Sequence, residues 1–577
     1  MPPRSLARAA ALAAALALPA PAAAQAPAFI EHPCRDDLPG ARCGTVTVPE
    51  NREQPGGRTI ALNVIVLPAR APERAREAVI FFAGGPGQPS TPMAGGFARQ
   101  FAALREDRDL LFVDQRGTGR SAPLQCRLRD PADPQSYLGD YFPPAAVARC
   151  LDELRGRADL TRYGYPELAH DVDAVRAALG YERLDLWGGS YGTRAAQVYM
   201  RTYPHRVRSA VLQGVVPPGY LQPAAYAQDV EAALAGLFAE CRVDAACHAA
   251  FPDPARELRQ VAERLESRPA AAEIVDPQSG ARLRLTLTRD AFADMIRKLL
   301  YEPALASMTP FVVHRAWEGD FRPAARLALM DRRNAAEGIW WGLTLSVTCS
   351  EDVAFIDSAA AARDNGRTFL GDYRVRQQTA ACRGWPRYSP PADYHALVRL
   401  EIPTLLVSGA LDPVTPPRWA ERALQALPNG VHVVVPHAGH SYNGMRGAAA
   451  CMDPIILRFY QQGSARGLDT SCVQRIQRPP FVISMAESIA LEAAALDRLA
   501  GEYASPGTPL RIRFERVSGG LRATANDGDT VVATPLSSTE FRFEGLPPGF
   551  AFVFSPDART VTMRIPGEPD LVLSRTP

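Results

Sequence analysis

The chain has 577 residues, of which 47% are hydrophobic, so it is long enough for two to four structural units. Its formal charge is +2, and without the two arginines of residues 1–24 it would be 0. This balance indicates neither a nucleic acid nor an anionic membrane as a partner. Lys298 is the only lysine and lies in an amphipathic stretch, which argues against a P-loop or a Schiff-base cofactor. We expect no cofactor.

Residues 1–24 have the layout of a secretory signal peptide. Arg4 and Arg8 precede an apolar run rich in alanine and leucine, and three small residues, Ala22 to Ala24, end it. No later run is long and apolar enough to span a bilayer. The arginine-rich, lysine-poor composition suggests a GC-rich bacterial genome. We therefore expect a secreted or periplasmic bacterial protein that begins near Gln25.

Ten cysteines, an even number in an exported chain, predict disulfides. No C-x-x-C or cysteine-histidine spacing suggests a metal site, and we expect none. Sequence does not fix the connectivity, but the simplest scheme joins consecutive cysteines in short loops. The expected pairs are Cys34 with Cys43, Cys126 with Cys150, Cys241 with Cys247, Cys349 with Cys382, and Cys451 with Cys472.

Short β-rich runs alternate with helical patterns in the N-terminal half, each bounded by Gly, Pro or Asp. This order is typical of an α/β protein with a mostly parallel sheet covered by helices. The runs are 45–48, 60–67, 78–83, 110–114, 184–188 and 207–212, and two more, 403–408 and 431–435, follow much later in the chain. The long gap before the last two predicts an insertion, so we expect the core in residues 25–216 and 399–478.

The intervening residues 217–398 show helical periodicity over 229–241, 255–265, 289–300 and 323–330, with one β-like patch near 281–287. They predict a mainly helical cap. Beyond the core, a helical pattern over 486–500 precedes short alternating runs at 510–517, 530–533, 541–544 and 560–565, separated by turn signals. Residues 479–577 therefore predict a small antiparallel β domain.

The motif that carries chemistry is Gly188-Gly189-Ser190-Tyr191-Gly192, which follows a β-rich run and precedes a helical stretch. A G-x-S-x-G motif in this setting is a nucleophile elbow, in which the glycines leave room for a strained turn that exposes the serine. The alternative is a glycine-rich turn with an idle serine. The flanking strand and helix favour Ser190 as a nucleophile.

A serine nucleophile needs a base and an orienting acid, which follow the serine in that fold in the order acid, then histidine. Asp412 follows the run at 404–408, and His440 follows the run at 431–435, next to Gly439. The alternatives are His437 as the base and a turn-capping role for Asp412. We expect a triad of Ser190, Asp412 and His440.

The tetrahedral intermediate of such a reaction needs backbone N–H donors. One comes from the residue after the nucleophile and one from the loop after the third strand. These are Tyr191 and the loop 84–87, in which we expect Gly85 to be the donor. The segment 114–121 closes the next strand, and we expect Arg116 to support the glycine loop rather than take part in chemistry.

Together these motifs resemble the tripeptidyl aminopeptidase and proline iminopeptidase branch of the α/β hydrolases, over about residues 35–475. The cysteine-bearing segments 241–247, 348–352 and 382–386 are similar to the tripeptidyl side. Ala83 departs from the pattern, because iminopeptidases usually have histidine there and tripeptidyl enzymes often have proline. The resemblance implies an α/β-hydrolase fold and a secreted serine exopeptidase that acts on peptides; the tail after 478 lies outside it.

An exopeptidase of this kind must bind the ammonium group of its substrate, and carboxylates are the natural partners. The cap offers Glu351 and Asp352, next to Cys349. The alternative is a solvated acidic pair at a helix start. Two other functions stay open: a carboxylesterase or lipase with the same triad, since acyl-enzyme chemistry does not distinguish ester from amide, and an inactive binding protein that works through its β tail.

Overall fold

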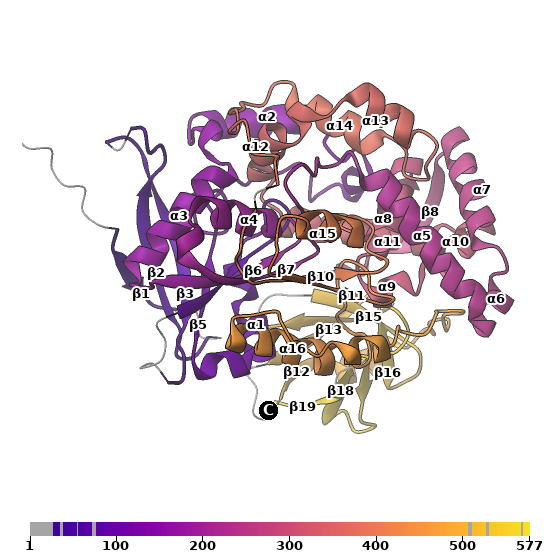
Figure 1. Ribbon diagram of the computed structural model, residues 1–577. Helices are drawn as coiled ribbons and strands as arrows, with labels where there is room; N and C mark the ends of the chain where they lie inside the picture. Colours follow the sequence, from indigo (N-terminus) through magenta and orange to yellow (C-terminus); the bar gives the residue numbers. More distant parts are fainter. Residues whose placement is uncertain are drawn as a thin grey trace, which may run out of the picture.

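The computed structural model describes residues 27–34, 38–54, 56–71, 77–397, 399–505, 510–526, 530–566 and 569–576. The signal peptide expected in residues 1–24 lies outside them. Figure 1 shows a sheet with flanking helices, a largely helical insertion beside it, and a yellow C-terminal barrel that packs below both. Within the described residues, no helix combines the length and the apolar character needed to cross a bilayer.

A nine-stranded sheet forms the centre of the core, in the order β1-β2-β3-β5-β4-β6-β7-β10-β11. The pairs β1–β2, β2–β3 and β3–β5 are antiparallel, and the other five are parallel. Every β-rich run expected for the core overlaps a strand and extends at most one residue beyond it, whereas β1 was not predicted. The strands are β1 (Phe29–His32), β2 (Arg42–Pro49), β3 (Thr59–Leu67), β4 (Glu77–Phe82), β5 (Asp109–Val113), β6 (Arg183–Gly189), β7 (Val207–Gln213), β10 (Thr404–Gly409) and β11 (Gly430–Val435).

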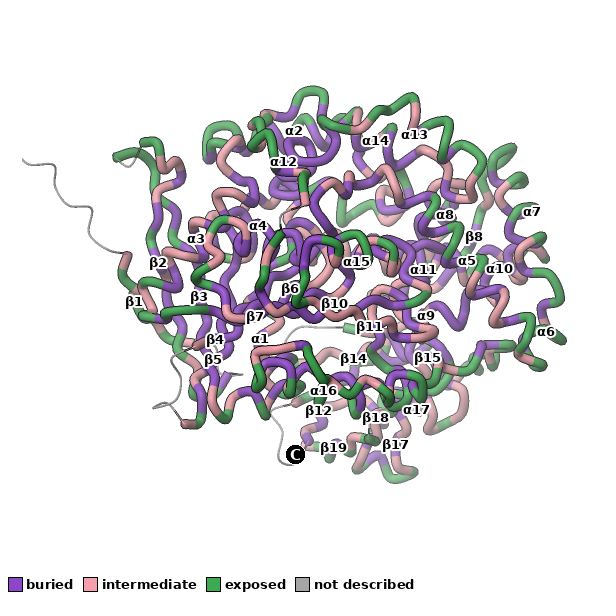
Figure 2. The backbone as a smooth tube through the Cα atoms, in the orientation of Figure 1, coloured by how far each residue is buried: buried purple, intermediate pink, exposed green. Residues whose placement is uncertain are grey.

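Helices cover both faces of this sheet, so alternate side chains of one strand enter different hydrophobic clusters. Ile80 and Leu186 lie in the cluster of one face, while Phe81 and Trp187 lie in that of the other. The central strands are accordingly buried in Figure 2. The first face carries α2 (Pro144–Arg155), α3 (Tyr165–Ala178), α4 (Gly192–Thr202) and α15 (Pro417–Leu424), and the second carries α1 (Ala94–Gln100) and α16 (Ala448–Gln462).

The insertion leaves the sheet after β7 and returns before β10. The β-like patch expected near 281–287 is β9 (Arg282–Leu287), and it pairs with β8 (Ala270–Val275), a strand that was not predicted. The helices of the insertion are α5 (Tyr226–Val243), α6 (Ala245–Ala250), α7 (Pro254–Ser267), α8 (Arg289–Leu299), α9 (Pro303–Ala306), α10 (Thr309–Trp317), α11 (Arg322–Gly338), α12 (Trp341–Glu351), α13 (Ser358–Asn365) and α14 (Tyr373–Cys382).

The C-terminal strands close into an antiparallel barrel, and a core of aromatic side chains fills it. Phe514, for example, meets the rings of Phe552 and Phe554 edge to face, with centroids 4.8 and 5.1 Å away. The strands are β12 (Gly501–Ala504), β13 (Arg511–Val517), β14 (Gly520–Ala525), β15 (Thr530–Pro535), β16 (Glu540–Phe543), β17 (Ala551–Phe554), β18 (Thr560–Arg564) and β19 (Leu571–Arg575).

The chain before the barrel differs from the expected helix over 486–500, because only α17 (Ala493–Leu499) is helical. Upstream of it the chain has no regular secondary structure and contacts the barrel, where the Ile489 amide donates a hydrogen bond to the Pro535 carbonyl at 2.9 Å. The barrel also contacts the cap. Arg326 of α11 forms an ion pair with the buried Glu544.

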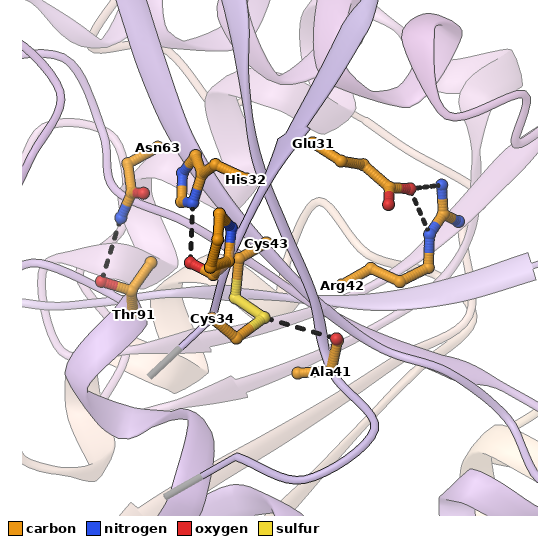
Figure 3. Close-up of a disulfide and its surroundings, with 9 residues drawn as sticks. Glu31, His32, Cys34, Ala41, Arg42, Cys43, Asn63 and Thr91 are labelled. Carbon is orange, nitrogen blue, oxygen red and sulfur yellow. Dashed lines mark hydrogen bonds and ion pairs between the residues drawn. A yellow bond between two sulfur atoms is a disulfide. The ribbon is translucent and has the colours of Figure 1, made fainter. Parts of the chain in front are cut away.

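Five disulfides join the ten cysteines in consecutive pairs, with Cα–Cα distances from 5.2 to 5.7 Å. Figure 3 shows Cys34 and Cys43, which tie the segment after β1 to β2. The ion pair between Arg42 and Glu31, 2.6 Å long, lies beside that bridge. In the cap, Cys349 at the end of α12 is joined to Cys382 at the end of α14.

Candidate active site

Ser190 stands on a sharp turn between β6 and α4. Its backbone has φ of +54°, in the left-handed region that a residue other than glycine rarely adopts. A Cβ atom at Gly192 would lie 2.2 Å from the Phe82 carbonyl oxygen, and one at Gly188 would lie 2.9 Å from the Gly192 carbonyl oxygen. Only glycine fits these two positions, and the tight packing holds the strained serine in place.

The loop after β4 passes directly over the serine. A Cβ atom at Gly84 would lie 3.0 Å from the Cβ of Ser190. The cap fixes this loop, because the Thr344 hydroxyl donates a hydrogen bond to the Pro86 carbonyl at 2.6 Å. The amides of Gly85 and Tyr191, the expected oxyanion donors, therefore belong to backbone that runs beside the nucleophile on both sides.

Asp412 lies at the end of β10, and His440 follows β11. His440 Nδ1 is 2.7 Å from Asp412 Oδ2, and the carboxylate also accepts hydrogen bonds from the Thr415 amide and hydroxyl at 2.8 and 2.6 Å. Burial alone would raise the pKa of Asp412, but His440 and Thr415 hold that pKa below its ordinary value. The aspartate is thus an anion that orients the imidazole.

The other candidate base, His437, points elsewhere. Its Nδ1 lies 2.7 Å from Glu240 on α5, and 38% of its side chain is exposed. Of the two histidines that sequence left open, His440 is the one that contacts Asp412.

Ser190 and His440 line one cavity of about 490 Å³, together with Gly84, Gly85 and Tyr191. This volume lies in the range of small-molecule and peptide pockets. The core supplies these residues, whereas the cap supplies charged side chains from α8, α11 and α14, namely Arg297, Lys298, Asp331 and Arg374. The cavity thus lies between core and cap.

The expectation that Arg116 supports the glycine loop is wrong. Its guanidinium forms two hydrogen bonds with Asp171 of α3, at 2.6 and 2.7 Å. The neighbouring Asp114 takes the supporting part, because its carboxylate accepts a hydrogen bond from the Thr91 amide at 2.9 Å, a few residues beyond the loop.

Glu351 is fully buried at the end of α12, away from the cavity. Its carboxylate accepts hydrogen bonds from the Tyr165 amide at 2.9 Å, from the Tyr388 hydroxyl at 2.5 Å, and from the Tyr394 hydroxyl. Burial raises the pKa of Glu351 to about 7, and these donors only partly oppose it. A carboxyl group with three protein donors and no exposed surface does not suit a substrate amine.

Asp352 is equally buried and also lies outside the cavity lining. It pairs with Arg194 of α4 at 2.7 Å and accepts a hydrogen bond from the Tyr191 hydroxyl at 2.6 Å. Asp352 therefore ties the cap to the helix that follows the nucleophile. These contacts argue against the amine-binding role expected from the sequence for both acids.

Sequence reasoning missed the carboxylates that do line the cavity, Glu302 and Asp331. Asp331 lies 3.7 Å from the ammonium group of Lys298, whose Nζ is 4.1 Å from the centre of the Tyr301 ring. The Tyr301 ring in turn lies 4.8 Å from the ring of His440. The one feature of the sequence that could have pointed to these carboxylates was Lys298, the sole lysine of the chain.

Two family models match the chain. The model described as alpha/beta hydrolase fold matches residues 77–253, and the model described as TAP-like protein matches residues 367–472. The first match contains the nucleophile elbow, and the second contains both Asp412 and His440.

Three curated relatives are similar to the chain. Serine protease Hip1 of Mycobacterium tuberculosis is 28% identical over 433 residues, which cover 67% of this chain and 80% of the relative. Tripeptidyl aminopeptidase of Streptomyces lividans is 32% identical and carboxylesterase B of M. tuberculosis 31% identical, each over 31% of this chain and 36% of the relative. The chain thus has the α/β-hydrolase fold, its C-terminal core segment is similar to TAP-like proteins, and it is a serine hydrolase.

Proposed function

We propose that this protein is an exported serine exopeptidase that releases short peptides from the free N-terminus of its substrates through an acyl-enzyme on Ser190. The observation that carries the proposal is one cavity, covered by the cap, in which Ser190 on its strained turn lies with a histidine held by a buried aspartate. The names of two relatives, a serine protease and a tripeptidyl aminopeptidase, support a peptidase over other hydrolases.

The residues would act in two half-reactions. His440 takes the proton of the Ser190 hydroxyl while the Ser190 oxygen attacks the scissile carbonyl carbon. The amides of Gly85 and Tyr191 stabilise the resulting oxyanion. The C–N bond then breaks, and His440 gives its proton to the leaving amine. In the second half, His440 deprotonates a water molecule that attacks the acyl-enzyme, which releases the N-terminal fragment as an acid and restores the serine.

Glu302 is the carboxylate that we assign to the substrate ammonium. It lies directly before α9, at the cavity wall, and burial raises its pKa although Ser441, His440 and Lys298 oppose the change. A protonated amine would compensate the cost of that partly buried charge. Asp331 is less suited, because it already faces Lys298.

The test compares a tripeptide anilide that has a free N-terminus with its N-acetylated form. The parent enzyme should favour the free peptide by at least about tenfold in kcat/KM. Glu302→Gln should lower that ratio by about tenfold, or roughly 1.4 kcal/mol. The matched control is Glu351→Gln, which should keep the ratio, because Glu351 lies outside the cavity. Equal rates for both peptides in the parent would contradict exopeptidase action.

A carboxylesterase is the second candidate, favoured by the similarity to carboxylesterase B and by a triad that accepts esters as readily as amides. Such an enzyme would hydrolyse short acyl esters and leave every peptide intact. An inactive binding protein would hydrolyse neither. Rates on both substrate classes separate the three functions.

Export rests on the signal-like residues 1–24 and on the five disulfides, which form and persist in oxidising compartments. We propose that the protein works in the periplasm or outside the cell.

A further inference from the structure

A small side cavity of about 50 Å³ opens beside the oxyanion loop. Gly85 and Pro86 form one wall, and α14 contributes Arg374 and Gln378 to another. Since one water molecule needs about 10–15 Å³ of such volume, this space admits a carboxylate-sized group. Gly85 and Arg374 also line the main cavity, so a substrate held at Ser190 can reach the side cavity.

Arg374 is a buried cation with few partners. Only 4% of the residue is exposed, and its guanidinium carbon lies 3.6 Å from the centre of the Tyr141 ring. Its one ion pair among the described residues is a long contact of 3.4 Å with Asp294, and its buried Nε has no hydrogen-bond partner there. The guanidinium therefore retains donors that no protein group uses.

Cations outnumber carboxylates around Arg374, where Asp294 and Asp331 lie among three arginines and Lys298. Asp294 is also 2.9 Å from Arg297 and 3.0 Å from Arg332, so one buried carboxylate serves three guanidinium groups. These arginines hold the pKa of Asp294 well below its ordinary value, although burial alone would raise it. Buried charges without partners are costly, so the cluster favours a further anion.

Gln378 lies one helical turn after Arg374 and hence on the same face of α14. It is 1% exposed, and neither its Oε1 nor its Nε2 has a hydrogen-bond partner in the described part of the chain. An amide N–H next to a guanidinium offers two adjacent donors, which is the arrangement that a carboxylate accepts.

We propose that Arg374 and Gln378 form a subsite that binds a carboxylate of the substrate. The inference rests on the proposed function, since it places the subsite in the same cavity as Ser190. The carboxylate has two possible sources, an acidic side chain or the C-terminal carboxylate of a short peptide. The enzyme would thus prefer acidic or very short peptides.

The experiment measures kcat/KM for pairs of short peptides with free N-termini that differ only in a carboxylate against a carboxamide. One series exchanges Glu for Gln at each position, and the other exchanges a C-terminal acid for its amide. In the parent, replacing the carboxylate by a carboxamide in one of the two series should lower kcat/KM at least about tenfold. Arg374→Met should remove that preference, Arg374→Lys should restore part of it, and Gln378→Leu should lower it about threefold.

Arg332→Gln is the matched control, since Arg332 shares Asp294 but lines neither cavity, and it should keep the preference. Labelling of Ser190 by a fluorophosphonate in each variant shows that the site is intact. The half-ester of succinic acid with nitrophenol, compared with its amide analogue, tests the subsite even without peptide cleavage. The proposal is overturned if no pair differs by more than twofold in the parent, or if the preference survives in Arg374→Met. If the enzyme prefers peptides with a free N-terminus but shows no carboxylate effect, the subsite proposal fails and the proposed exopeptidase function is retained.

Discussion

The burial of Glu351 makes the stability of the protein depend on pH. Its pKa rises from 4.5 to about 7 in the folded chain, and at 1.36 kcal/mol for each unit of pKa this corresponds to about 3 kcal/mol. Because the folded-state pKa is the higher one, the folded protein binds more protons between these values. The contribution of Glu351 to the free energy of unfolding is therefore fully present below pH 4.5 and is lost as the pH rises through 7.

Glu351→Gln removes this titration. The substitution also adds a cost that does not depend on pH, because the amide nitrogen of glutamine would face donors such as the Tyr165 amide. The total loss of stability is therefore largest at low pH, where the parent still has the contribution of protonated Glu351. The test is the difference in free energy of unfolding between parent and variant, from urea titrations at pH 4.5 to 7.5. That difference should shrink by about 3 kcal/mol with rising pH. Parallel pH curves would refute the assignment of a buried, protonating carboxyl to Glu351.

Three further changes test the site. His440→Ala should lower kcat at least about 1000-fold and His437→Ala less than about threefold, as stopped assays on one ester substrate can show; similar losses in both would contradict the assignment of the base. Asp412→Asn should cost about 100- to 10,000-fold in kcat, and a near-normal rate would remove its orienting role. Gly84→Ala should lower kcat/KM about tenfold, because the new Cβ would crowd the nucleophile, whereas Gly96→Ala, with open space around it, should be neutral; equal effects would refute the steric argument.

The nucleophile turn could be predicted from the sequence because the G-x-S-x-G motif, the strand before it and the helix after it are contiguous in the chain. Gly188 is required by atoms of the turn itself, whereas Gly192 is required by the Phe82 carbonyl at the end of β4, far earlier in the chain. The runs that form the core strands are likewise bounded by residues that end strands, so the α/β fold followed from pattern alone. Asp412 and His440 followed from chain order, although His437 could be set aside only when its contact with Glu240 was seen.

The roles of the acids in the cap could not be predicted, because long-range contacts decide them. The partners of Glu351 include Tyr394, 43 residues later, and Asp352 pairs with Arg194, 158 residues earlier. A sequence shows that two acids are adjacent but not that tyrosines and an arginine enclose them. The predicted helix over 486–500 failed for a related reason, since hydrogen bonding to the barrel competes with helix formation in its first half.

The most direct test of the central claim is the site of covalent modification. The full chain, with its disulfides intact, is treated with a fluorophosphonate, digested, and mapped by mass spectrometry. One adduct is expected, on Ser190, and its formation should stop all hydrolysis. Labelling of a different serine with Ser190 unmodified, or full hydrolysis by Ser190→Ala, would contradict the account.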